Sequence, residues 1–214
     1  MTAIGHSIQM STLYLSGGSY YDISGNRSAI VTDYLDPLTD NHLHRVLTPN
    51  TYSARVNDSI NDYTVSVLSQ TVHNYTDPHI YFAWAAVLQG SHGLTDSDNF
   101  TLQLTGDTTH TALYNISYSS ASAAGTSLFT QSSSDWFYTD WQLQTLDVSA
   151  LQGSDFTLSL LASDCPDGGH AGYVYLDGFG NVAPPITGTP EPGSLLLIGF
   201  GAISLLALKN RLTA

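Results

Sequence analysis

The stretch NFTLQLTG, residues 99–106, alternates apolar and polar side chains with a period of two. In an extended chain, Phe100, Leu102 and Leu104 point to one face and the intervening Thr and Gln point to the other. This alternation is typical of an antiparallel strand with one face buried and the other in water. We therefore predict a strand here, with its three large apolar side chains in the core.

Segments of the same type lie on both sides, separated by turn residues every eight to twelve positions. Residues 155–163 repeat the alternation, and residues 79–88 are apolar on both faces, which predicts a central strand. The other predicted strands are 29–35, 51–57, 63–72, 111–119, 141–149 and 172–180. With no convincing amphipathic helix, this series predicts an all-β fold: an antiparallel two-sheet β-sandwich that is jelly-roll-like.

Charge is distributed unevenly along the chain. Residues 1–188 hold seventeen Asp against three Arg, a formal charge of −14, while the only Glu and the only Lys lie beyond them. Such a surface repels phosphate backbones, so nucleic-acid binding is excluded as a function class. It suits calcium, cationic partners or solubility outside the cell.

The composition changes at Asn181, where a stretch rich in proline and glycine begins. We predict a β-sandwich domain over residues 1–182, a linker over 183–193 and a short hydrophobic C-terminal helix over 194–214. The run from Leu195 to Leu208 has fourteen uncharged residues, about 21 Å as a helix against about 30 Å of hydrocarbon. It is therefore short for a permanent anchor. The sequence leaves three alternatives for this segment: a membrane anchor, a buried C-terminal helix or a tag that is processed.

The end of the chain resembles the PEP-CTERM sorting signal. Pro190, Glu191 and Pro192 precede the apolar segment, and Lys209 and Arg211 follow it. The resemblance implies an exported protein of a Gram-negative bacterium that makes exopolysaccharide, with Pro-Glu-Pro read by a membrane-embedded peptidase, the exosortase. The implied location is transient anchoring in the membrane by the C-terminal helix, then the cell surface or the extracellular matrix.

A looser resemblance covers residues 45–180, where DCPDGGHAGYVYLD and two upstream segments look like a jelly-roll module of exported bacterial proteins. It supports the predicted fold and implies no activity. The first residues have neither the basic nor the apolar region of a signal peptide. We therefore expect an export signal upstream of Met1 and an incomplete N-terminal part of the sandwich.

The densest polar cluster of the domain lies near its end. One interpretation makes Cys165 and His170 a nucleophile and its base, and another makes Asp164, Asp167 and Asp177 ligands of calcium. The third interpretation is a connecting loop, because Pro and Gly turn the chain here and Asp favours turns. We favour the loop, with a buried thiol and no cofactor, and keep calcium as the alternative.

Aromatic residues gather in SSSDWFYTDW, residues 132–141. If this segment is a loop, Trp136, Tyr138 and Trp141 form a surface that contacts glycans. Otherwise the same residues belong to an ordinary sandwich core, which we favour.

Two function hypotheses follow. The first is a non-enzymatic surface or matrix protein associated with exopolysaccharide or biofilm, and the second is a carbohydrate-binding β-sandwich module exported by the same route. An enzyme is not expected, because paired carboxylates and a catalytic-triad pattern are not apparent in the sequence.

Overall fold

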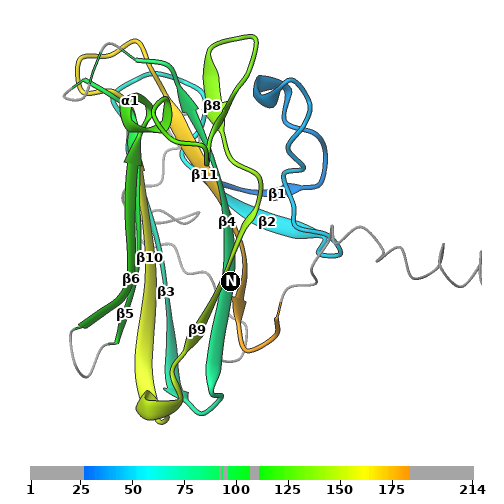
Figure 1. The fold of residues 1–214 in the computed structure, drawn as a ribbon, viewed down its shortest axis with the longest axis vertical. Coiled ribbons are helices and arrows are strands. Elements are labelled where there is room, and N and C mark those ends of the chain that lie inside the picture. The colour runs from blue at the N-terminus through cyan, green and yellow to red at the C-terminus, as the bar shows by residue number, and fades with distance from the viewer. Residues whose placement is uncertain (1–26, 92, 94–95, 107–110, 184–214) are drawn as a thin grey trace, which may run out of the picture. The chain divides into compact units, whose positions relative to one another are not determined.

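The computed structural model describes residues 27–183, except 92, 94–95 and 107–110. In this part of the chain, two antiparallel sheets face each other and form a β-sandwich, as predicted (Figure 1). Contacts divide the chain into two units, Met1–Pro184 and Pro185–Ala214, and every described residue belongs to the first. The predicted linker and C-terminal helix lie outside the described residues, apart from the start of the linker at Ala183.

The smaller sheet has four strands within the described residues. In order across the sheet they are β3 (Val65–Tyr75), β10 (Ser154–Ser163), β5 (Asn99–Gly106) and β6 (Thr111–Ser119). The two alternating segments of the sequence are therefore neighbours, and Leu158 pairs with Leu104 while Leu160 pairs with Leu102.

The larger sheet has seven strands within the same part of the chain. Six run in the order β1 (Ala29–Thr32), β2 (Tyr52–Val56), β11 (Gly172–Gly180), β4 (His79–Gln89), β8 (Trp136–Tyr138) and β7 (Thr130–Gln131). The seventh, β9 (Gln142–Asp147), pairs with the first half of β4, beside β8. As predicted, β4 is a central strand, with β11 on one side and β9 and β8 on the other.

Helical structure in the described residues is limited to three short elements. They are α1 (Ser120–Ala123) and the 3-10 helices η2 (Pro37–Thr39) and η3 (Ser149–Leu151). The α1 turn begins with a capping box, in which Ser119 and Ser122 exchange side-chain and backbone hydrogen bonds. It joins β6 to the segment before β7.

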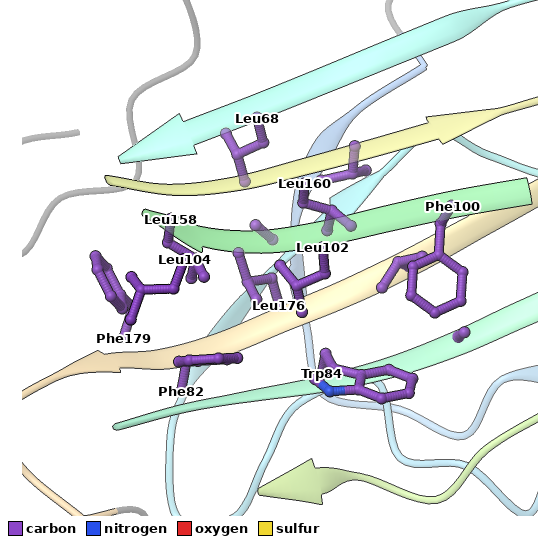
Figure 2. Packing of buried hydrophobic residues seen from close by; sticks show 14 of the residues in the cluster. Leu68, Phe82, Trp84, Phe100, Leu102, Leu104, Leu158, Leu160, Leu176 and Phe179 are labelled. Carbon is purple, nitrogen blue, oxygen red and sulfur yellow. The ribbon is translucent and has the colours of Figure 1, made fainter. Parts of the chain in front are cut away.

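The main core lies between the two sheets (Figure 2). Phe100, Leu102 and Leu104 of β5 are completely buried, and the intervening Thr and Gln are partly exposed, which confirms the predicted facing. Figure 2 shows the opposing layer, in which Phe82 and Trp84 of β4 meet these leucines. Burial of such side chains contributes about 1.5–3 kcal/mol each.

A second apolar cluster lies on the other face of β4. Its members come from the larger sheet, from the segment between β1 and β2, and from the residue before β11: Val31, Leu43, Ala85, Val87, Trp136, Tyr138, Ala171, Tyr173 and Tyr175. This covering layer explains why β4 is apolar on both faces.

One buried carboxylate, that of Asp36, holds the segment between β1 and β2 (residues 33–51, the covering segment) against the larger sheet. The hydroxyls of Tyr173 and Tyr175 donate to Asp36 Oδ2 at 2.7 and 2.8 Å, and the Leu38 N–H donates to Oδ1 at 2.9 Å. Asp36 is 2% exposed. Burial and the adjacent carboxylate raise the pKa of both tyrosines, so each keeps its proton and remains a donor.

The strand predictions differ from the structure in several places. The first strand ends at Thr32 rather than residue 35, and β3 continues to Tyr75 rather than ending at residue 72. Residues 130–138, which were not among the predicted strands, contain β7 and β8. Each of these two is at most three residues long, too short for a period of two to be visible.

Candidate functional site

The aromatic segment does not form an exposed loop. Trp136 and Tyr138 lie on β8 and are only 6% and 7% exposed, because they pack into the apolar cluster under the covering segment. The indole of Trp141 packs against the same cluster and donates to the His44 carbonyl at 2.8 Å. Trp136 and Tyr138 therefore lie in the apolar cluster, and Trp141 lies partly buried beside it, while a glycan contact at these three residues stays an untested prediction.

The acidic residues of the calcium hypothesis lie in different surroundings. Asp164 and Asp177 are buried, and Asp167 is exposed in the loop between β10 and β11. Among the described residues, no three His, Cys, Asp or Glu side chains gather as metal ligands. Calcium binding stays an untested prediction.

The two buried carboxylates hold backbone groups in place. Asp164 accepts hydrogen bonds from Asn57 Nδ2 and from the N–H groups of Asp62 and Thr64, at 2.8 to 3.2 Å. Asp177 accepts from the Leu47 N–H, from an Asn side chain and from the next residue's N–H. Burial is the main cause that raises the pKa of both carboxyls, and these donors act against it.

Residues 164–171 connect β10 to β11, as the loop interpretation predicted. The Cys165 N–H donates to the His170 carbonyl at 3.0 Å, which closes the loop at its base. Cys165 is free and fully buried, and its thiol donates to the Asp96 carbonyl at 3.0 Å. A thiol held in this way fits the predicted buried cysteine better than a nucleophile.

A cleft is lined in part by residues of α1. Figure 1 shows α1 at one end of the sandwich. The end cleft has a volume of about 310 Å³ and is lined in part by Ser91, Ser120, Asp135, Phe137 and His170. These residues come from the segment after β4, from α1, from the β7–β8 turn, from β8 and from the loop before β11. The volume is at the lower end of the usual range for small-ligand sites.

Three serine hydroxyls form a hydrogen-bonded chain at this cleft. The Ser120 hydroxyl donates to Ser91 Oγ at 2.8 Å, and the Ser91 and Ser97 hydroxyls are 2.6 Å apart. The Ser97 hydroxyl donates in turn to the Gly93 carbonyl. Ser91 and Ser120 line the cleft; Ser91 is partly exposed and Ser120 only 1% exposed, so the chain fixes the Ser91 hydroxyl on the wall.

Asp98 is a buried carboxylate beside the same residues. Its Oδ2 accepts the Gln89 N–H at 3.1 Å, and its backbone carbonyl accepts the Ser120 N–H at 3.1 Å. The side chain is inaccessible to solvent, and Oδ1 has no hydrogen-bond partner among the described residues. Burial is the main cause that raises the pKa of Asp98 to about 7, with Asp164 adding to the rise and the Gln89 N–H opposing it.

The predicted sorting residues Pro190, Glu191, Pro192, Lys209 and Arg211 lie outside the described residues. Within residues 27–183, gaps excepted, no helix has the length and apolar character needed to cross a membrane. The predicted membrane helix over 194–214 therefore stays a prediction.

The described residues define an antiparallel β-sandwich protein, and carbohydrate-binding modules are among the solved structures that resemble it. A family 61 module in complex with β-1,4-galactotriose is 10% identical over 72% of this chain and 81% of that chain, with a TM-score of 0.39. A family 28 module specific for non-crystalline cellulose is 10% identical over 62% and 76%, with a TM-score of 0.36. Likeness at this level carries no conclusion about a ligand.

The chain carries a PEP-CTERM protein-sorting motif, whose family model matches residues 189–211. This match confirms the resemblance of the C-terminus and indicates an exported protein with a C-terminal sorting signal. No curated protein sequence matches the chain.

Proposed function

We propose that this chain is an exported, non-enzymatic surface or matrix protein that an exosortase-type membrane peptidase recognises and processes at its C-terminus. The observation that carries the proposal is the PEP-CTERM motif at residues 189–211. Once released, the acidic sandwich remains at the cell surface or in an extracellular polysaccharide matrix.

The chemistry of the tail supports transient anchoring. An apolar run of fourteen residues spans about 21 Å as a helix, less than the hydrocarbon thickness. Lys209 and Arg211 at its end favour the cytoplasmic side, which leaves the acidic domain outside. Pro190 and Pro192 keep the preceding backbone out of a helix, so a peptidase meets an extended substrate.

The proposal that the protein is not an enzyme rests on the surroundings of its candidate catalytic side chains. The Cys165 thiol is inaccessible and hydrogen-bonded to a carbonyl. The Asp164 and Asp177 carboxylates hold backbone N–H groups and act as structural acceptors. These arrangements stabilise loops and leave the groups poorly placed for acid, base or nucleophilic work.

The proposal is tested by changing the motif in a Gram-negative host that has an exosortase. Glu191→Ala and the double change Pro190→Ala with Pro192→Ala should keep the chain in the membrane fraction, whereas the wild type leaves it. Pro185→Ala is the matched control, because it removes a linker proline outside the matched motif. Release of both motif variants at the wild-type level would contradict recognition of Pro-Glu-Pro.

Carbohydrate binding is the second candidate function. The observation in its favour is the end cleft, which is lined by Phe137 together with Ser91 and Ser120, whose hydroxyls are hydrogen-bonded to each other. Aromatic rings contact the C–H faces of sugars while hydroxyl groups bind their edges. A binding protein delivered to a polysaccharide matrix combines both functions.

A further inference from the structure

The rim of the end cleft joins two segments of the chain. The Gly90 N–H donates to the Asp135 carbonyl at 2.7 Å, which joins the segment after β4 to the β7–β8 turn. The Asp135 carboxylate lies against Gly90 so closely that a Cβ there would be 2.5 Å from Oδ2. The rim is therefore built around a glycine, because a side chain at this position would displace Asp135.

The wall of the cleft presents one hydroxyl oxygen to a ligand, that of Ser91, which is partly exposed. The Ser120 hydroxyl donates to it from a residue that is only 1% exposed, and Ser97 ends the chain on a backbone carbonyl. A hydroxyl oxygen accepts as well as donates, so Ser91 keeps acceptor capacity for an O–H group of a ligand. Its oxygen is held by the chain and loses little freedom on binding.

The cleft also has apolar surface. Phe137 is partly buried against the main core and forms part of the lining, together with Ala121 of α1. A cleft lined by the Ser91 hydroxyl, the Asp135 carboxylate and Phe137 matches a molecule with polar edges and an apolar face, which describes a pyranose ring.

Charge around the cleft restricts the kind of sugar. Asp135 lies at its rim, and Asp96 belongs to a neighbouring segment. The lining residues include one His, His170, and no Lys or Arg, in a domain whose first 188 residues carry a formal charge of −14. A negative potential of this kind repels carboxylated and sulfated sugars.

We propose that this cleft binds one neutral sugar unit of a polysaccharide, with Phe137 against the ring face and Ser91 and Asp135 accepting from its hydroxyls. The proposal rests on the carbohydrate-binding function proposed above, and it adds the site and the charge class of the ligand. It excludes uronic-acid polysaccharides as ligands of this cleft.

Calorimetric titration of the full chain tests the proposal. The probes are neutral tetrasaccharides of glucose, galactose, mannose and N-acetylglucosamine, with tetragalacturonate as the anionic counterpart of the galactose probe. We expect at least one neutral probe to bind, and tetragalacturonate to bind at least about tenfold more weakly than its neutral counterpart.

Substitutions of residues that line the cleft test whether the sugar binds there. Phe137→Leu keeps apolar bulk without the ring and should weaken binding by about tenfold, and Ser91→Ala combined with Ser120→Ala should do the same. Tyr52→Ala is the control, because Tyr52 is 58% exposed on β2 and does not line the cleft. Thermal unfolding of each variant separates a lost contact from a lost fold.

Each of the other outcomes contradicts a specific part of the proposal. Neutral binding that both lining variants leave unchanged removes the cleft as the site and keeps the carbohydrate function. Binding of tetragalacturonate alone overturns the charge class. If no probe binds at millimolar concentration, the cleft proposal and the carbohydrate function both fail, whereas the sorting proposal has its own test at the C-terminus.

Discussion

Replacing Asp98 with Asn should remove a pH-dependent destabilisation of the folded state, measured as the free energy of unfolding. Burial raises the pKa of this carboxyl from 3.8 to about 7. The native protein therefore holds a proton that the unfolded chain has already released between these pH values. The resulting decrease in the free energy of unfolding is absent below about pH 4, grows as the pH rises to about 7, and is constant above it.

The size of the effect follows from the two pKa values. Their difference corresponds to about 4 kcal/mol of unfolding free energy at pH 8. About 3 kcal/mol of this accumulates between pH 5 and pH 8. Asn has nearly the same shape, and its carbonyl oxygen can still accept the Gln89 N–H that Asp98 Oδ2 accepts.

Urea unfolding of the full chain at pH 5 and pH 8 measures the effect. From pH 5 to pH 8, the unfolding free energy of the wild type should fall by about 3 kcal/mol relative to that of Asp98→Asn. Asp140→Asn is the control, since it removes one charge from an exposed residue and should follow the wild type. If wild type and Asp98→Asn change equally with pH, Asp98 is ionised or solvated in the native state and the description of the cleft is wrong.

Three further predictions concern stability, each measured by chemical unfolding. Leu160→Ala removes a fully buried side chain paired with Leu102 and should cost about 2–5 kcal/mol, and a cost below about 1 kcal/mol would contradict the core described here. Tyr175→Phe leaves Asp36 with one hydroxyl donor fewer and should cost about 1.5–3 kcal/mol, so an unchanged value would contradict the fastening of the covering segment. Gly172→Ala should cost about 1–3 kcal/mol, because its Cβ would be 2.8 Å from Leu88 Cδ2, and tolerance of the change would contradict this close packing.

The sandwich could be predicted because its core strands carry one repeating signal. Residues 99–106 and 155–163 alternate clearly and are neighbours in the sheet, so local pattern and global packing agree. The order of strands could not be predicted, because register and neighbours depend on contacts far apart in the sequence. The short strand β8 was missed for a related reason, since its pairing with β4 defines it.

The polar part of the candidate site was missed because its residues resemble turn residues. Ser91, Ser97 and Ser120 are common loop residues, and only the fold brings their hydroxyls together. Asp98 did carry a signal: extending the alternation of residues 99–106 back by one step places it on the same inward face as Phe100. Asp36 had no such pattern, since the tyrosines that bind it are more than 130 positions away.

The central claim is that the C-terminal motif directs export and processing of this chain. Its most direct test is the intact mass and location of the full chain in a Gram-negative host with an exosortase and in the same host without it. With the exosortase, the account predicts a released protein that lacks the residues beyond a cleavage point near Pro190–Pro192. An uncleaved, membrane-retained chain in both hosts would contradict the account.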